Sequence, residues 1–224
     1  MGLAVRGLPL LFALKSSTPS TMTFPQHIHL EGRLCTLMTM RPSHLPDLQR
    51  ISHDEEIWRH LPMEGWDNEI FWEWGIQTLQ SKDSGRAHPF VITDTHTGEL
   101  LGSTRFQEVY AEHRKLEIGW TWIVRKAWGT GLNKEAKLLL LDYAFGHLEA
   151  LRVGFKTDEN NLRSQQALLN IGASFEGIHR KHMVRPNGSH RNSFFYSITD
   201  EEWPEARLRI QAALQPEVER LVWM

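Results

Sequence analysis

Two kinds of hydrophobic spacing alternate along the chain and predict a mixed α/β (α+β) fold. Runs of apolar, β-branched and aromatic residues predict strands, and they cover residues 34–40, 90–94, 100–106, 117–124 and 152–157. Apolar residues at helical spacing predict helices at residues 42–52, at 68–80 and after Asn133. Ser43 is the expected cap of the first helix, and the turn at residues 95–98 joins two strands as a hairpin. We therefore expect a mostly antiparallel central sheet flanked by helices.

The turn between the strand at residues 117–124 and the helix after Asn133 holds two glycines, Gly129 and Gly131. Glycine lets backbone N–H groups approach a ligand closely, and the start of a helix adds unpaired donors and the positive end of a dipole. The turn therefore suits a diphosphate. A tight turn without a ligand is the other interpretation, and the turn alone does not separate the two.

The length and composition of the chain favour one domain. With 224 residues, 41% of them hydrophobic, the chain can bury a sizeable core. We expect that domain at residues 23–224 and a flexible arm at residues 1–22. The apolar run at residues 7–14 contains a proline, lacks a small-x-small cleavage site and is too short to span a bilayer. We therefore predict neither a signal peptide nor membrane insertion.

Charge and cysteine content exclude several other classes of protein. A net charge of −2 and a pI near 6.6 give no electrostatic footprint for general nucleic-acid binding. The single cysteine, Cys35, rules out an internal disulfide and fits a cytoplasmic location; its strand-like surroundings favour a buried apolar role over a nucleophilic one. No carboxylate or cysteine joins the histidines at ligand spacing, so we expect no structural metal.

Several short motifs follow one another in order from residue 117 onward. They are Glu117-Ile118-Gly119-Trp120, Trp128-Gly129-Thr130-Gly131, Asn161-Leu162-Arg163-Ser164 and Gly172-Ala173-Ser174-Phe175-Glu176-Gly177. A closing hairpin and final helix are indicated by Pro186-Asn187-Gly188 and Glu202-Trp203. In this order the motifs resemble the GNAT superfamily of acetyl-CoA-dependent N-acetyltransferases, and within it the branch that contains the ribosomal-protein alanine N-acetyltransferases. The resemblance covers roughly residues 28–215.

The resemblance implies an enzyme that transfers an acetyl group from acetyl-CoA to a primary amine by direct attack in a ternary complex. The amine is expected to be a protein or peptide N-terminus or a small cationic amine. A non-catalytic acyl-CoA-binding or sensing module is the alternative. It is supported by two departures from the superfamily pattern, Lys126 in place of arginine or glutamine and Leu168 in place of a tyrosine acid.

Two residues are the candidates for catalysis. Glu117 stands where the resembled branch carries a glutamate proposed to act as the base, either directly or through water. A cross-strand partner for Lys115 or Arg114 is its other interpretation. Because Leu168 cannot donate a proton, Ser164 or a water is the expected proton donor to the leaving thiolate.

The resemblance also implies the acetyl-CoA contacts. The strand end would pair with the pantetheine amides through Ile123 and Val124, and Asn161 would hold the same arm, although Asn161 also suits a helix cap. Lys126 would supply positive charge. The remaining predicted contacts lie in the aromatic-glycine loop and its helix start, at Trp128, Gly129, Thr130, Gly131, Leu132 and Asn133.

Residues 53–73 carry seven carboxylates against one arginine, interleaved with tryptophans. Acidic and aromatic groups together would attract a cationic amine. A solvated acidic face over a tryptophan core is the competing interpretation. Antiparallel edges and the aromatic surface favour a homodimer.

Overall fold

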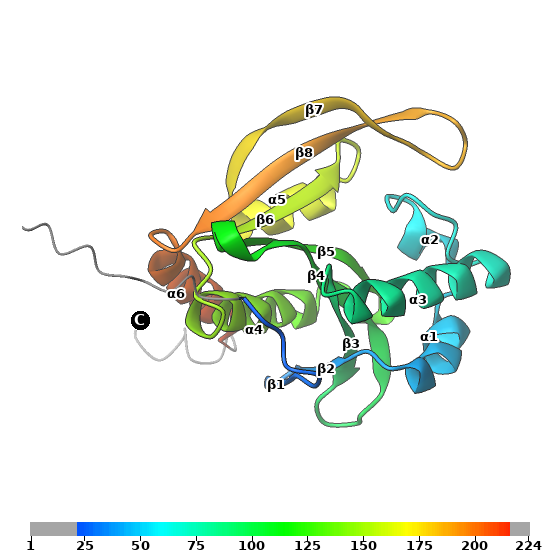
Figure 1. Cartoon of the computed structure of the whole chain (residues 1–224), viewed down its shortest axis with the longest axis horizontal. Helices are drawn as coiled ribbons and strands as arrows, with labels where there is room; N and C mark the ends of the chain where they lie inside the picture. The colour runs from blue at the N-terminus through cyan, green and yellow to red at the C-terminus, as the bar shows by residue number, and fades with distance from the viewer. Residues whose placement is uncertain (1–21, 216–224) are drawn as a thin grey trace, which may run out of the picture.

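The computed structural model describes residues 22–215, and its described strands form one eight-stranded sheet (Figure 1). The order across the sheet is β1-β2-β3-β4-β5-β6-β8-β7. All neighbours are antiparallel except β5 and β6, which are parallel. The strands are β1 (His29–Glu31), β2 (Cys35–Thr39), β3 (His88–Asp94), β4 (Leu100–Tyr110), β5 (Lys115–Ile123), β6 (Arg152–Asp158), β7 (Ser174–Val184) and β8 (His190–Thr199).

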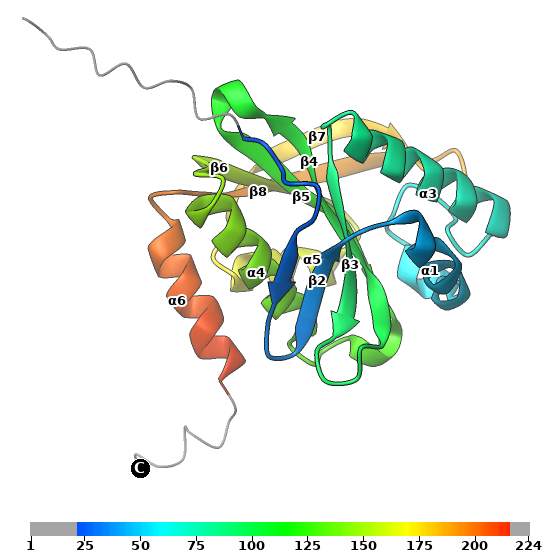
Figure 2. The ribbon, with the colours of Figure 1, turned by 60° about the horizontal axis from the view of Figure 1, so that its bottom comes forward.

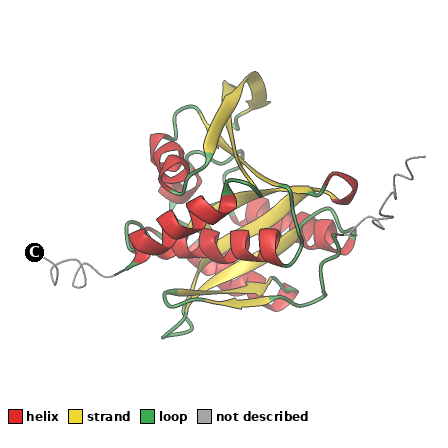
Figure 3. Cartoon of the chain, turned by 90° about the vertical axis from the view of Figure 1, so that its left-hand side faces the viewer, coloured by secondary structure: helices red, strands yellow, loops and turns green. Residues whose placement is uncertain are grey.

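Helices cover both faces of this sheet (Figure 2). They are α1 (Leu45–Ile51), α2 (Glu55–Trp58), α3 (Asn68–Asp83), α4 (Leu132–Gly146), α5 (Leu162–Asn170) and α6 (Trp203–Leu214), with short 3-10 turns η1 (Pro42–His44), η2 (Ala111–His113) and η3 (Arg125–Ala127). One face carries α4 and α6, and the other carries α1 and α3. The β7–β8 hairpin extends away from the helices at the top of the molecule (Figure 3).

Alternating residues of the strands divide the interior into two cores, because successive side chains point to opposite faces of a sheet. In β3, Phe90 and Ile92 enter the main core under α4, whereas Val91 enters a second core under α1 and α3. The second core is rich in tryptophan, with Trp58 and Trp122 tilted against each other at 5.1 Å between ring centroids. The buried tryptophans at this end of β5 therefore form part of one wall of the pocket described in the next subsection.

Strands β5 and β6 pair over only three residues before they part. The register ends at Glu117 opposite Gly154, after which β5 continues beside β4 while β6 continues beside β8. A bulge in β5 adds to the divergence, since the register with β4 shifts there and Trp120 takes a positive φ of 50°. The two strands therefore form a fork that opens toward α4 and α5.

The predicted mixed, mostly antiparallel sheet with flanking helices is confirmed, as are the hairpin β3–β4 and the long helices α3 and α4. The cap prediction at Ser43 was wrong. Residues 42–44 form a 3-10 turn whose N-cap is Arg41, with the Arg41 N–H donating to His44 Nδ1 at 3.2 Å. Helix α1 starts at Leu45, and its N-cap, His44, makes no side-chain cap hydrogen bond. Cys35 is fully buried, as expected.

The predicted arm lies outside the described residues, except for its last residue, Met22, which packs in the main core. None of the described helices has the length and apolar character needed to cross a membrane.

Candidate active site

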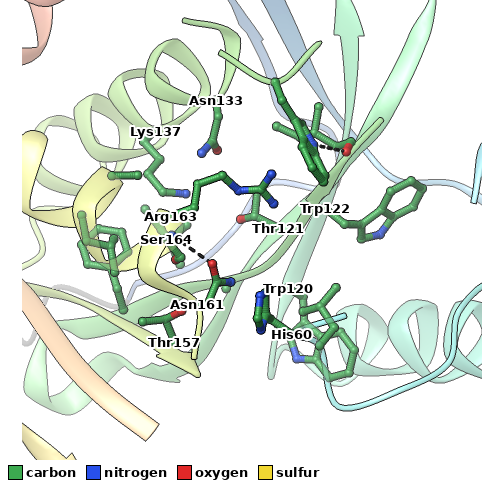
Figure 4. Close-up of a pocket in the computed structure, with 18 of the residues that line it drawn as sticks. His60, Trp120, Thr121, Trp122, Asn133, Lys137, Thr157, Asn161, Arg163 and Ser164 are labelled. Atoms are coloured by element: carbon green, nitrogen blue, oxygen red, sulfur yellow. Dashed lines mark hydrogen bonds between the residues drawn. The ribbon is translucent and has the colours of Figure 1, made fainter. Parts of the chain in front are cut away.

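A pocket of about 380 Å³ occupies the fork between β5 and β6. Its walls come from β5, the loop after η3, the first turns of α4, the end of β6 and the first turns of α5, with α2 at one edge. Figure 4 shows side chains from α4 and α5 on one side of the pocket and tryptophans of β5 on the other. The pocket therefore brings together segments that the sequence analysis linked only by motif order.

The glycine loop forms the entry to α4. Gly129 and Gly131 both have left-handed backbone, with φ of 78° and 88°, and Gly131 is the N-cap of α4. Gly131 offers no side chain to cap the helix, and of the first N–H groups the Leu132 N–H makes only a long contact with Thr130 Oγ1, at 3.4 Å. Gly129, Gly131 and Asn133 line the pocket, whereas Leu132 is buried in the main core and the Thr130 hydroxyl donates to the Ala127 carbonyl at 2.9 Å.

Some backbone groups at the end of β5 already make hydrogen bonds within the protein. Val124 N–H donates to the Leu101 carbonyl at 2.9 Å, and the Ile123 carbonyl accepts from Trp128 Nε1 at 2.8 Å. Strand-like pairing of Ile123 and Val124 with a ligand would thus use their other backbone groups. Trp128 lines the pocket and ties the loop back to β5.

Lys126 lies away from the pocket. Its ammonium pairs with Glu99 Oε1 at 2.5 Å on the surface, and Lys126 is not among the residues that line the pocket. The cationic residues that line the pocket are Lys134 and Lys137 on α4, Lys156 on β6, Arg163 on α5 and Arg191 on β8. Sequence reasoning did not identify them. The Arg163 guanidinium lies 3.5 Å from the centroid of the Trp128 ring, which is a cation–π contact across the mouth of the fork.

Asn161 caps α5, and its Oδ1 accepts from Ser164 N–H at 3.0 Å. Both residues also line the pocket, so the cap leaves the Asn161 amide and the Ser164 hydroxyl available there (Figure 4). Leu168, one turn further along, is buried in the pocket floor and in the main core. The cap interpretation of Asn161 is therefore confirmed, while its contact with a cofactor stays a prediction.

Glu117 is 8% exposed at the closed end of the fork. Its Oε1 accepts from Gln107 Nε2 at 2.5 Å and pairs with Lys156 Nζ at 3.3 Å. The expected alternative partners do not contact it, because Arg114 pairs with Glu149 and Lys115 lies over the Tyr110 ring. Lys156 lines the pocket, whereas Glu117 is not among the lining residues.

The far end of the pocket is bounded by Glu56, His60, Asp158 and Arg191. Asp158 accepts two hydrogen bonds from Arg185, at 2.9 and 3.0 Å. Burial raises the pKa of Asp158, but the Arg185 hydrogen bonds, the Asn160 N–H and the charges of Arg185 and Arg191 together outweigh burial and hold that pKa below its usual value. Burial lowers the pKa of the His60 imidazole.

The acidic segment contributes little to this end. Of its seven carboxylates, only Glu56 lines the pocket. Asp54 pairs with Arg125 and caps α2, and Asp67 caps α3. Within residues 22–215, no group of three or more histidine, cysteine or carboxylate side chains is placed to hold a metal ion.

Comparisons with known proteins agree with this geometry. The family model for the acetyltransferase (GNAT) domain matches residues 35–174, more than half of the chain. The N-acetyltransferase YoaA of Bacillus subtilis, itself uncharacterized, is 32% identical over 102 residues, which are 46% of this chain and only 56% of YoaA. The structure of a candidate acetyltransferase from T. thermophilus is 35% identical, with a TM-score of 0.76 over 86% of this chain and 99% of the other.

A more distant neighbour shares the fold. Mycobacterium smegmatis RimJ, solved in complex with CoA-disulfide, is 22% identical, with a TM-score of 0.71 over 84% of this chain and 93% of its own. Sequence match, fold and the open fork beside a glycine loop all point the same way. The chain belongs to the GNAT acetyltransferase family.

Proposed function

We propose that the protein transfers an acetyl group from acetyl-CoA to a primary amine. The observation that carries the proposal is the pocket in the β5–β6 fork, which runs from an uncapped helix start at a glycine loop to a polar far end. An N–H-lined helix start suits a diphosphate, and the fork beyond it suits a narrow arm. The RimJ neighbour, which binds CoA-disulfide in the same fold, supports CoA as the ligand.

The proposed reaction is direct attack by a neutral amine on the thioester in a ternary complex. The new amide bond forms as the carbon–sulfur bond breaks, and the thiolate takes a proton. Ser164, or a water beside it, is the proposed donor of that proton. Glu117 is the proposed base; because it pairs with Lys156 and does not itself line the pocket, it would receive the amine's proton through a water.

The proposed acceptor is a protein or peptide N-terminus or a small amine. A free α-amino group has a solution pKa of about 8, so its deprotonation at neutral pH costs little. Since Glu56 is the single member of the acidic segment at the pocket, charge attraction for a polycation is weaker than the sequence suggested. This favours an N-terminus over a polyamine.

A non-catalytic acyl-CoA-binding module remains the second candidate. Two side chains favour it: Lys126 is engaged by Glu99 outside the pocket, and Leu168 offers the pocket a hydrocarbon surface rather than a hydroxyl group. Such a module would bind acyl-CoA and release no thiol with any amine.

The test is thiol release from acetyl-CoA against a panel of peptides with free N-termini, polyamines, amino acids and aminoglycosides, with calorimetry of acetyl-CoA binding in parallel. Acceptor-dependent release supports the transferase and identifies its substrate class. Binding without release across the panel favours the module. Absence of binding contradicts both.

A further inference from the structure

Lys137 is a buried lysine with an unpaired ammonium group. It lies on α4, is 8% exposed and lines the pocket. Among residues 22–215, no hydrogen bond or ion pair engages its ammonium. Burial alone lowers its pKa, to about 8, because no neighbouring carboxylate offsets the loss of water. A buried ammonium without a partner destabilises the protein unless a ligand group accepts a hydrogen bond from it.

Asn133 lies one helical turn before Lys137, so the two side chains share a face of α4. Its Oδ1 is buried and has no hydrogen-bond partner within the described residues. Asn133 lines the same pocket, and Figure 4 shows both side chains pointing from α4 toward α5. One helix face therefore holds an unpaired acceptor, which water does not reach, and an unpaired donor, both on residues that line the same cavity.

The position of Lys137 along α4 limits which part of a ligand it can contact. Lys137 lies five residues beyond the start of the helix at Leu132, which corresponds to about 7 to 8 Å along its axis. A diphosphate at the glycine loop would contact the N–H groups of the helix start. The more exposed cations Lys134 and Arg163 lie along the same pocket and suit charged oxygens at its mouth. Lys137 lies deeper, where the arm of the ligand would pass.

We propose that Lys137 and Asn133 bind the amide-containing pantetheine arm of the acyl-CoA, with Lys137 donating to a carbonyl oxygen and Asn133 Oδ1 accepting from an amide N–H. This inference rests on the proposed function, since it names residues for the same donor. Pantetheine carries amide carbonyl and N–H groups along its length, and an unsatisfied buried partner discriminates strongly against a ligand that lacks them. The pair thus selects an acyl-CoA over other diphosphates.

The test compares acetyl-CoA binding by calorimetry for the wild type, Lys137→Met and Lys134→Met at 50 mM and 500 mM NaCl. Lys137→Met is expected to weaken binding by about tenfold or more, as loss of a hydrogen bond to a charged donor does. Because the contact is buried and its partner neutral, the loss should persist at high salt. Lys134→Met removes the same charge from the same helix, and its smaller loss should shrink at high salt. Lys137→Gln, which keeps a donor without charge, should lie between the wild type and Lys137→Met.

The outcomes separate the inference from the function it rests on. If the wild type fails to bind acetyl-CoA, the proposed function itself is wrong. If the wild type binds and Lys137→Met loses less than twofold, the role of Lys137 is overturned while the function stands. A loss that disappears at 500 mM NaCl would assign Lys137 to a phosphate and overturn its contact with the arm.

Discussion

Lys156 Nζ lies 3.3 Å from Glu117 Oε1, across the closed end of the fork. Glu117 is the last residue of β5 that pairs with β6, and Lys156 lies two residues past its partner Gly154. The ion pair therefore joins the two strands at the point where they part. Gln107 from β4 donates to the same carboxylate, so three neighbouring strands hold it. Lys156 lines the pocket, and Glu117 does not.

Replacement of Glu117 by glutamine is expected to lower turnover by about 10²- to 10⁴-fold, the usual contribution of a general base. Glutamine keeps the size of the side chain but cannot take a proton from the amine. Acetyl-CoA affinity should change little, because Glu117 is not among the residues that line the pocket. Steady-state kinetics with the best acceptor of the panel, together with calorimetry, measure both effects.

Glu112→Gln is a matched control, since Glu112 is an exposed glutamate in η2, outside the pocket. Unchanged turnover of Glu117→Gln would remove Glu117 from the mechanism and leave it as the structural partner of Lys156.

Two substitutions separate the cap function of Asn161 from its proposed contact with the cofactor. Asn161→Ser keeps a side-chain oxygen that can accept from the Ser164 N–H, so stability should stay within a few tenths of a kcal/mol. Asn161→Ala loses the cap and should cost about 1 kcal/mol. Both remove the amide, so both should weaken acetyl-CoA binding. Equal affinity of the serine variant and the wild type would reduce Asn161 to a cap.

Arg185 holds the buried Asp158 with two hydrogen bonds. Removing it leaves that carboxylate with the Asn160 N–H at 2.8 Å and, as its nearest cation, the more distant Arg191, whose Nε lies 3.8 Å away. Arg185→Met should therefore cost about 2 to 4 kcal/mol of unfolding free energy, measured by urea denaturation at pH 7. The pKa of Asp158 is depressed in the folded protein, so this stability is present above the carboxyl's unfolded pKa and is lost as pH falls below it.

Arg180→Met, at an exposed arginine of β7, should leave stability within about 0.5 kcal/mol of the wild type. If Arg185→Met is as mild as this control, the Asp158 pair contributes nothing measurable to the pocket's far wall.

Local patterns were sufficient to predict the elements themselves. The β3–β4 hairpin carries its own turn, and α4 carries Ala136, Leu140 and Ala144 on one buried face, so neighbouring residues determine both. The glycine loop was also predictable from the sequence, because Gly129 and Gly131 both take the positive φ that favours glycine. Residue order was therefore enough to recognise the family fold.

Residues that depend on long-range geometry were missed or misplaced. That β5 and β6 separate after Glu117 follows from pairing with β4 and β8, which no local pattern encodes. Lys126 was expected at the cofactor, but a surface glutamate 27 positions earlier in the chain, Glu99, engages it. Lys137 had one available signal, its helical spacing from Asn133 in the predicted loop.

The unpaired Lys137 predicts a stability cost in the unliganded protein. Its pKa is about 8 when folded and 10.5 when unfolded, so between these values the unfolded chain binds more protons and stability rises with pH. Below pH 8 the full cost applies, about 3 kcal/mol at roughly 1.4 kcal/mol per pKa unit. Lys137→Met should therefore be more stable than the wild type at pH 7, and the difference should shrink by pH 10. Urea denaturation of both proteins without acetyl-CoA at the two pH values measures it. A less stable methionine variant at pH 7 would mean that the ammonium has a partner within the protein, and that burial is offset before any ligand binds.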